Sequence, residues 1–122
     1  MEIGISTASF YSRSRTEDAI TTIGALGAKL CEVFLDSYSE YEKGFGLLFL
    51  DRARQAGLKI VSIHAMSQQF EPQLFSLSSR QKEDAWALLE KVFAQGQRLG
   101  AKNYVMHGPA LLRGALKNAE LT

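Results

Sequence analysis

The sequence predicts an α/β fold in which four parallel strands alternate with helices that cover one face of the sheet. Three segments share one frame, in which a glycine is followed two residues later by lysine and then by a short apolar stretch; they are 27–34, 57–64 and 100–107. A helical pattern of apolar residues precedes each glycine. Strands that alternate with helices are joined by crossover connections, and such connections produce parallel strands.

The residue types of this frame suit a helix end followed by a strand. Gly27, Gly57 and Gly100 are suited to the left-handed conformation that ends a helix. The lysine that follows lies near the negative end of the helix dipole. The β-branched and aromatic residues after it favour a strand.

The first strand is expected at 2–7, with no helix before it. The first helix is expected to begin near Ser14 or Thr16, where Ser14 and Glu17 have the spacing of a capping box. Its predicted apolar stripe consists of Ala19, Ile20, Ile23 and Leu26.

Two further helices are expected at about 45–56 and 79–99, the latter capped by Ser78 and Gln81. The second helix directs Leu48, Phe49 and Ala53 inward. The third has a predicted buried face of Ala85, Trp86, Leu89, Val92, Phe93 and Gly96. After Pro109, apolar positions suggest a fourth helix, weakened by Gly114; they are Leu111, Leu112, Ala115, Leu116 and Ala119.

Alternate residues of each strand point to opposite faces of the sheet. Counted from the frame glycines, one face is apolar and should pack under the helices; it consists of Cys31, Val33, Val61, Ile63, Tyr104 and Met106. The other face is mixed and becomes more polar toward the strand ends; it includes Gly4, Ser6, Leu30, Glu32, Phe34, Ile60, Ser62, His64, Asn103, Val105 and His107. A polar layer on one face is typical of a barrel interior with a site at its mouth.

His64 and His107 occupy the same offset on consecutive strands, so both imidazoles are expected at one mouth. Two converging histidines suit a divalent metal, hydrogen bonding to a polyol, or proton transfer near neutral pH. Glu32, two residues deeper on the neighbouring strand, could orient a histidine or bind a substrate hydroxyl. The alternatives are that the histidines are structural and that Glu32 pairs with a basic side chain.

Other notable side chains are expected to be structural. Asp36, Tyr38 and Tyr41 are predicted to lie on a surface loop. Cys31 is expected to be an inert core thiol, and Trp86 a core residue.

The composition excludes several classes of protein. The 122 residues carry a net charge of +1, and residues 1–61 and 62–122 have net charges of −1 and +2, so no basic platform for nucleic acid is present. No apolar run is long enough to span a membrane. The single cysteine excludes an internal disulfide and, with no secretory signal, predicts a cytoplasmic protein.

Segments 3–7, 30–34, 61–65 and 99–109 together resemble the xylose-isomerase-like TIM-barrel superfamily, which includes sugar-phosphate isomerases and epimerases and endonuclease IV. The resemblance spans nearly the whole chain. It implies a (β/α)₈ barrel with a divalent metal, Mn, Zn or Mg, at its C-terminal mouth. In the endonuclease branch the matching positions, His64 and His107, are metal ligands. In the isomerase branch they more often touch substrate, and the main metal ligands lie on later strands.

The resemblance implies catalytic roles for Glu32 and His107, substrate binding by His64 and Ser6, and metal binding by His64 and His107. The function it implies is the N-terminal portion of a metal-dependent sugar or sugar-phosphate isomerase or epimerase, inactive by itself. One alternative is a phosphodiesterase acting on abasic DNA. Another is an inactive half barrel that self-associates.

Four strands make half of such a barrel, which needs about 250 residues. Residues 1–122 are therefore expected to be an N-terminal half, truncated near the fourth helix, because 118–122 has the character of an interrupted helix. The alternative is a homodimer in which two copies pair along their open sheet edges and together form an eight-stranded barrel. The expected partner is a small carbohydrate, with no membrane and no nucleic acid.

Overall fold

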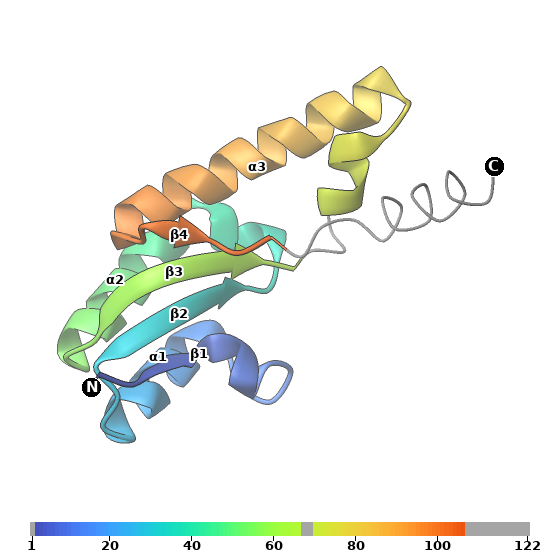
Figure 1. Ribbon diagram of the computed structural model, residues 1–122. Helices are drawn as coiled ribbons and strands as arrows, with labels where there is room; N and C mark the ends of the chain where they lie inside the picture. Colours follow the sequence, from blue (N-terminus) through green and yellow to red (C-terminus); the bar gives the residue numbers. More distant parts are fainter. Residues whose placement is uncertain (1, 67–69, 107–122) are drawn as a thin grey trace.

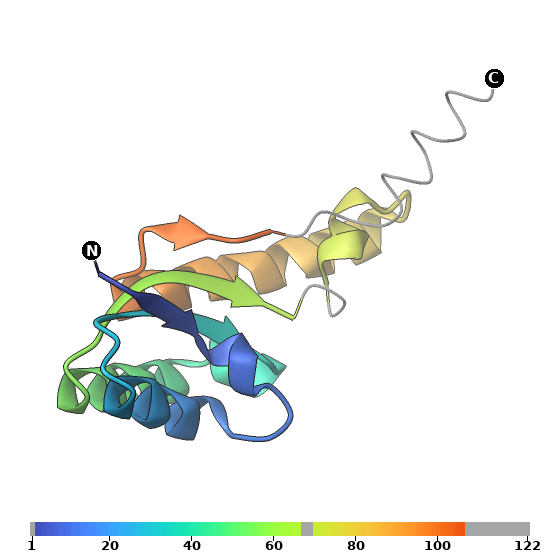
Figure 2. The ribbon, with the colours of Figure 1, turned by 60° about the horizontal axis from the view of Figure 1, so that its bottom comes forward.

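The computed structural model describes residues 2–66 and 70–106. In this part of the chain four parallel strands form one sheet in the order β1-β2-β3-β4, as predicted. The strands are β1 (Gly4–Ser6), β2 (Leu30–Leu35), β3 (Lys59–Ala65) and β4 (Asn103–Tyr104). The connecting helices are α1 (Thr16–Ala25), α2 (Lys43–Gln55) and α3 (Ser79–Leu99). All three lie on the same face of the sheet (Figures 1 and 2).

Short 3₁₀ helices follow the first three strands at the C-terminal edge of the sheet. They are η1 (Thr7–Phe10), η2 (Tyr38–Tyr41) and η4 (Glu71–Phe75). Tyr41 is buried among the core residues, so the prediction that it lies on the surface is wrong, whereas Tyr38 is half exposed. Asp36 is partly buried.

The frame glycines end the helices as the sequence predicts. Gly27, Gly57 and Gly100 have φ angles of 90°, 71° and 75°, in the left-handed region that glycine adopts without strain. After α3 the chain closes with a hydrogen bond from Ala101 N–H to the Gly96 carbonyl. The sharp reversal directs each helix straight into the next strand.

The helix caps agree with the prediction only in part. Ser78 caps α3 and accepts a hydrogen bond from Gln81 N–H, as predicted. The capping box of Ser14 and Glu17 is wrong, because Arg15 is the N-cap residue of α1 and makes no side-chain cap hydrogen bond. Ser14 instead donates to the Arg15 carbonyl.

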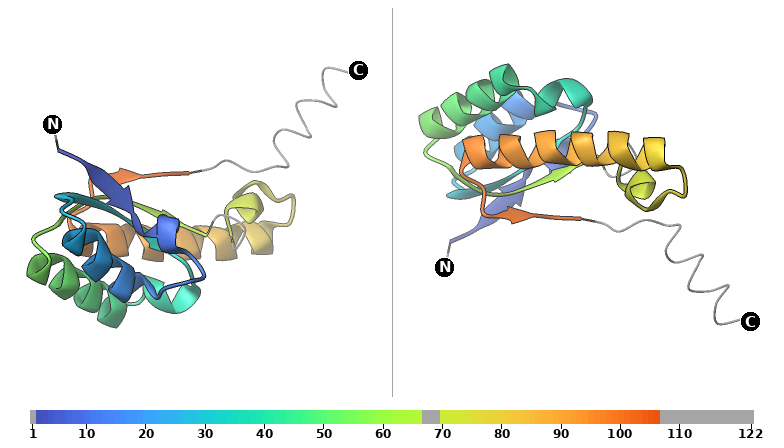
Figure 3. Two further views of the ribbon diagram at one scale, coloured as in Figure 1. Left: turned by 90° about the horizontal axis from the view of Figure 1, so that it is seen from below. Right: turned by 90° about the horizontal axis from the view of Figure 1, so that it is seen from above.

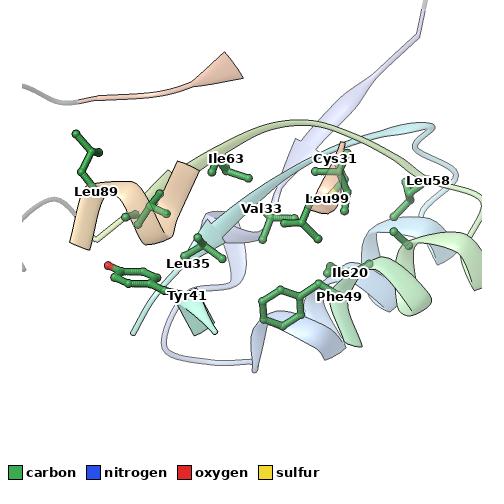
Figure 4. Packing of buried hydrophobic residues seen from close by; sticks show 14 of the residues in the cluster. Ile20, Cys31, Val33, Leu35, Tyr41, Phe49, Leu58, Ile63, Leu89 and Leu99 are labelled. Atoms are coloured by element: carbon green, nitrogen blue, oxygen red, sulfur yellow. The ribbon is translucent and has the colours of Figure 1, made fainter. Parts of the chain in front are cut away.

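The core lies between the sheet and the helices (Figure 4). It includes Ile20, Cys31, Val33, Leu35, Tyr41, Phe49, Leu58, Ile60, Ile63, Leu89 and Leu99. Three predicted core positions are wrong, because Leu26, Trp86 and Phe93 are 64%, 50% and 44% exposed. Leu26 follows the last residue of α1, and helical periodicity alone does not show which residues at the margin of the apolar stripe of α3 become covered.

A β-bulge changes the predicted faces of β3. Cys31 pairs with Ile60, but the next residue of β2, Glu32, pairs with Ser62, so β3 carries one extra residue. Ile60 consequently packs in the core, whereas Val61 is only half-buried. The prediction of Val61 inside and Ile60 at the mouth is wrong, because a bulge shifts the alternation by one residue.

The predicted fourth helix after Pro109 and the residue His107 lie outside the described residues. Within the described part of the chain, no helix is long and apolar enough to cross a membrane.

Candidate functional site

A polar cluster lies on the sheet face opposite the helices. Its side chains come from three adjacent strands: Ser6 ends β1, Glu32 lies on β2, and Ser62 and His64 lie on β3. The layer of helices α1 to α3 leaves this face of the sheet uncovered (Figure 3). In parallel α/β folds, sites form at the C-terminal ends of the strands, where this cluster is located.

Glu32 is the centre of the cluster. Its Oε1 accepts hydrogen bonds from Ser6 Oγ at 3.0 Å and from His64 Nδ1 at 2.9 Å. Its Oε2 accepts a hydrogen bond from Ser62 Oγ at 2.8 Å. Three donors from two neighbouring strands therefore fix one carboxylate in place, and Glu32 and His64 form the hydrogen bond that orienting this histidine would require.

The surroundings of Glu32 favour its charged form. Partial burial acts to raise the pKa of this carboxyl, but the hydrogen bonds from Ser62 and Ser6 and the proximity of His64 together outweigh it. The pKa of Glu32 therefore lies below its ordinary value. A carboxylate of lowered pKa is a weak base, so this geometry suits hydrogen bonding and orientation better than proton abstraction.

The ring of His64 lies between the carboxylate and an aromatic surface. Its centroid is 4.5 Å from that of Phe34, with 35° between the planes. Tyr11, which directly follows η1, packs edge-on against Phe34, with 5.4 Å between the two ring centroids. His64 is 8% exposed, and the Glu32 hydrogen bond and the Phe34 ring together hold its imidazole.

Glu32 also determines which nitrogen of His64 carries the proton. A carboxylate can only accept, so Nδ1 must be the donor of this pair and Nε2 is the ring nitrogen directed away from Glu32. Carboxylate-to-histidine pairs of this kind orient imidazoles that bind metals or hydroxyl groups.

The structure brings together Ser6, Glu32 and His64 from the predicted site. Ser62 was predicted on the same face but not as a site residue, although its pairing with Glu32 could have been found from their equal offset of five residues from a frame glycine. Ser6 also accepts a hydrogen bond from Ala8 N–H, so it is held by η1 as well as by Glu32.

The fourth predicted site residue, His107, lies outside the described residues. The register of β4 against β3 differs from the one that equal glycine offsets predict. Ser62 pairs with Asn103 and Ile63 with Tyr104, so β4 is displaced by two residues relative to the shared glycine frame. Equal offsets therefore do not correspond to equal height on β3 and β4, because each residue advances about 3.3 Å along a strand.

A second carboxyl, which the sequence analysis did not identify, is the buried Glu40 of η2. Glu40 accepts hydrogen bonds from the Thr16 hydroxyl at 2.9 Å and from Asp36 N–H at 2.9 Å. Burial, and then the charges of Asp36 and Glu17, raise the pKa of Glu40 to about 7 against the lowering effect of these hydrogen bonds. The burial of Glu40 cannot be predicted from a hydrophobic periodicity, because the residue lies in the short 3₁₀ helix η2.

A third carboxyl, Glu71 of η4, is 1% exposed and accepts a hydrogen bond from the Tyr104 hydroxyl. Tyr104 contacts Phe93 of α3 edge-on, so this pair belongs to the helix side of the sheet and not to the polar cluster. Burial, together with Glu71, raises the pKa of Tyr104.

The residues described do not complete a metal centre by themselves. Across 2–66 and 70–106, no three His, Cys, Asp or Glu side chains are grouped so that they could hold a metal ion. His64 is the one imidazole in this part of the chain, and Glu32 already accepts three hydrogen bonds.

The fold is shared with solved structures of sugar-converting enzymes. A D-psicose 3-epimerase crystallised in the presence of D-fructose matches with a TM-score of 0.65 and 14% identity, over 85% of this chain and 36% of that chain. A sugar phosphate isomerase/epimerase from Parabacteroides distasonis ATCC 8503 matches with a TM-score of 0.61 and 21% identity, over 89% of this chain and 42% of that chain. No family model and no curated protein matches the sequence.

These likenesses define the class of fold. In the part of the chain that the structure describes, three strand–helix units and a fourth parallel strand share the α/β fold of these enzymes. The chain spans 36% and 42% of the lengths of these two matched structures.

Proposed function

We propose that this chain forms the N-terminal part of a carbohydrate isomerase or epimerase barrel and contributes one side of the sugar-binding mouth. The observation that carries the proposal is the Glu32 carboxylate, held by Ser6, Ser62 and His64 on the uncovered face of the sheet. The fold of the two matched sugar enzymes supports this assignment. The proposed substrate class is a small sugar or sugar phosphate.

In this proposal Glu32 and His64 act as a unit on substrate hydroxyls. The ionised carboxylate fixes the His64 ring, and the neighbouring Phe34 provides an apolar wall. Ser6 and Ser62 keep Glu32 ionised. The acid–base role proposed for His107, and residues of a complete barrel beyond this chain, would supply the proton transfer.

The divalent metal implied by the resemblance remains a proposal that involves His64 and His107. Titration with Mn²⁺ tests it, because a bound paramagnetic ion broadens the NMR signals of nearby nuclei. We expect selective broadening around His64 that His64→Gln abolishes. Uniform weak broadening across the whole protein would refute the metal site while leaving the sugar proposal intact.

An NMR titration of the ¹⁵N-labelled chain with D-fructose and with fructose 6-phosphate tests sugar binding. We expect saturable shifts confined to the amides of Ser6, Glu32, Ser62 and His64, and their loss in Glu32→Gln. Glu42→Gln is the matched control, because Glu42 is an exposed carboxylate paired with Lys91. Shifts that survive Glu32→Gln, or that are absent from the unaltered protein, would overturn the proposal.

A further inference from the structure

A pocket that contains three carboxyl groups lies between the start of α1 and the segment that joins β2 to α2. Its volume is about 220 Å³, and its walls include Glu17, Asp36, Glu40, Arg15 and Phe45. Three acidic side chains thus share one cavity with a single guanidinium group. The lining is negative on balance, so it favours an occupant that brings positive charge.

Glu17 is the carboxyl of this pocket whose charge is not compensated. The residue is 8% exposed, and among the described residues its side chain accepts no hydrogen bond and forms no ion pair. Thr21 and Arg52 bond only to its main-chain carbonyl. Burial of a carboxylate costs free energy unless a donor or an opposite charge compensates it. An occupant of the pocket would supply the donor that Glu17 lacks.

Asp36 and Glu40 repel Glu17 across the pocket. Burial, and then the charge of Glu17, raise the pKa of Asp36, and burial with the charges of Asp36 and Glu17 raises the pKa of Glu40 to about 7. The Glu40 carboxyl is held by two neutral donors, the Thr16 hydroxyl and the Asp36 N–H. A cation placed among the three carboxyls would relieve this repulsion.

We propose that this pocket binds a small organic cation of the guanidinium class. A metal ion fits less well, since within 2–66 and 70–106 no three acidic or other metal-ligating side chains are grouped so that they could hold one. A guanidinium carries several N–H donors in a rigid plane, so it can bond to carboxyls that do not converge on one point. Phe45 also lines the pocket, and guanidinium groups stack on aromatic rings. Ser37 and Ser39 add hydroxyl acceptors.

Binding of the cation should depend on pH through Glu40. The charged groups that face Glu40 are Asp36 and Glu17, with Arg15 in the same pocket wall, whereas α2 and α3 present the uncharged Phe45 and Gln95. A cation favours the ionised form of Glu40, so binding should release its proton. The apparent affinity should therefore rise about tenfold from pH 6 to pH 8, because the ionised fraction of Glu40 rises by about that factor.

An NMR titration of the ¹⁵N-labelled chain with methylguanidinium chloride tests the proposal, and methylurea is the matched neutral probe of similar shape. We expect saturable shifts of the Glu17, Asp36 and Glu40 amides with the cation alone. Glu17→Gln should weaken binding about tenfold and retain the fold, because its side chain makes no hydrogen bond among the described residues. Asp18→Asn removes the same charge from an exposed carboxyl in the same turn of α1 and should leave binding unchanged.

Several results would overturn the proposal. In the unaltered protein, the absence of saturable shifts, or equal shifts with methylurea, would show that the pocket does not recognise a cation. Shifts that survive Glu17→Gln would confine Glu17 to stabilising the start of α1. The same shifts with Mg²⁺ at lower concentration would assign the pocket to a metal ion. An affinity that does not change between pH 6 and pH 8 would remove Glu40 from the binding groups and also overturn the proposal.

Discussion

Glu32 and Ser62 are direct cross-strand partners, and Ser62 Oγ donates a hydrogen bond to Glu32 Oε2 at 2.8 Å. This pairing depends on the β-bulge at Val61. Cys31, the residue before Glu32 on β2, pairs with Ile60, so Val61 has no partner on β2 and Glu32 pairs with Ser62. The bulge therefore lets β3 bury Ile60 and still present Ser62 and His64 on the open face. Local irregularity in one strand builds the polar cluster without exposing the core.

Glu32→Gln should destabilise the protein by about 1–3 kcal/mol, because three donors lose a charged acceptor. Urea unfolding at pH 7 measures this change. The lowered pKa of Glu32 stabilises the folded state above the unfolded value of 4.5, and this stabilisation is lost as pH falls through the lower folded pKa. The unaltered protein should therefore lose more stability than Glu32→Gln on acidification below about pH 4.5, and parallel curves would contradict this account.

The tautomer of His64 gives a second, independent test of the same pair. The ¹⁵N shifts of the ring should show a proton on Nδ1 in the unaltered protein, because Glu32 can only accept. Glu32→Gln should loosen this preference, since the amide offers both a donor and an acceptor. A proton found on Nε2 alone in the unaltered protein would refute the geometry.

Glu40 should give stability the opposite dependence on pH. Its pKa is raised from 4.5 to about 7, so in this window the folded state holds a proton that the unfolded state has released. The free energy of unfolding should therefore fall as pH rises from about 4.5 to about 7, by on the order of 3 kcal/mol for a shift of this size. Glu40→Gln should remove this decline, whereas Glu42→Gln, the exposed neighbour, should retain it.

Gln95 should be a strong determinant of stability although it is polar. It is fully buried on α3, and its Nε2 donates to the Glu40 and Glu42 carbonyls at 2.8 and 2.7 Å. Gln95→Leu leaves the buried Glu40 carbonyl and the partly buried Glu42 carbonyl without this donor and should cost about 1–3 kcal/mol in urea unfolding. Gln97→Leu, at an exposed position of the same helix, serves as the control and should cost much less.

The Cys31 thiol should resist modification in the folded protein. Burial, and then the adjacent charge of Glu32, raise the pKa of Cys31 to about 12, so almost no thiolate exists at neutral pH. A thiol reagent such as dithionitrobenzoate should react at pH 8 only after denaturant is added. Rapid stoichiometric reaction without denaturant would show that the core around β2 opens.

The repeated glycine frame determined most of the architecture from the sequence. Gly27, Gly57 and Gly100 mark helix ends because left-handed backbone is a local property of glycine, and such signals can be read without neighbours. The bounds of α3 were predicted for the same reason, since Ser78 caps one end and Gly100 closes the other. The convergence of Ser6, Glu32 and His64 followed from strand alternation within this frame.

Tertiary structure alone decided what depends on partners distant in the chain. The bulge at Val61, the two-residue displacement of β4 and the burial of Glu40 and Tyr41 arise from pairing and packing between elements, which no single segment encodes. The exposure of Trp86 has the same origin, because helical periodicity fixes which side chains share a face but not which element covers it. Local backbone conformation depends on residues that are adjacent in the sequence, whereas strand register and side-chain burial depend on contacts between strands and helices that form only in the folded protein.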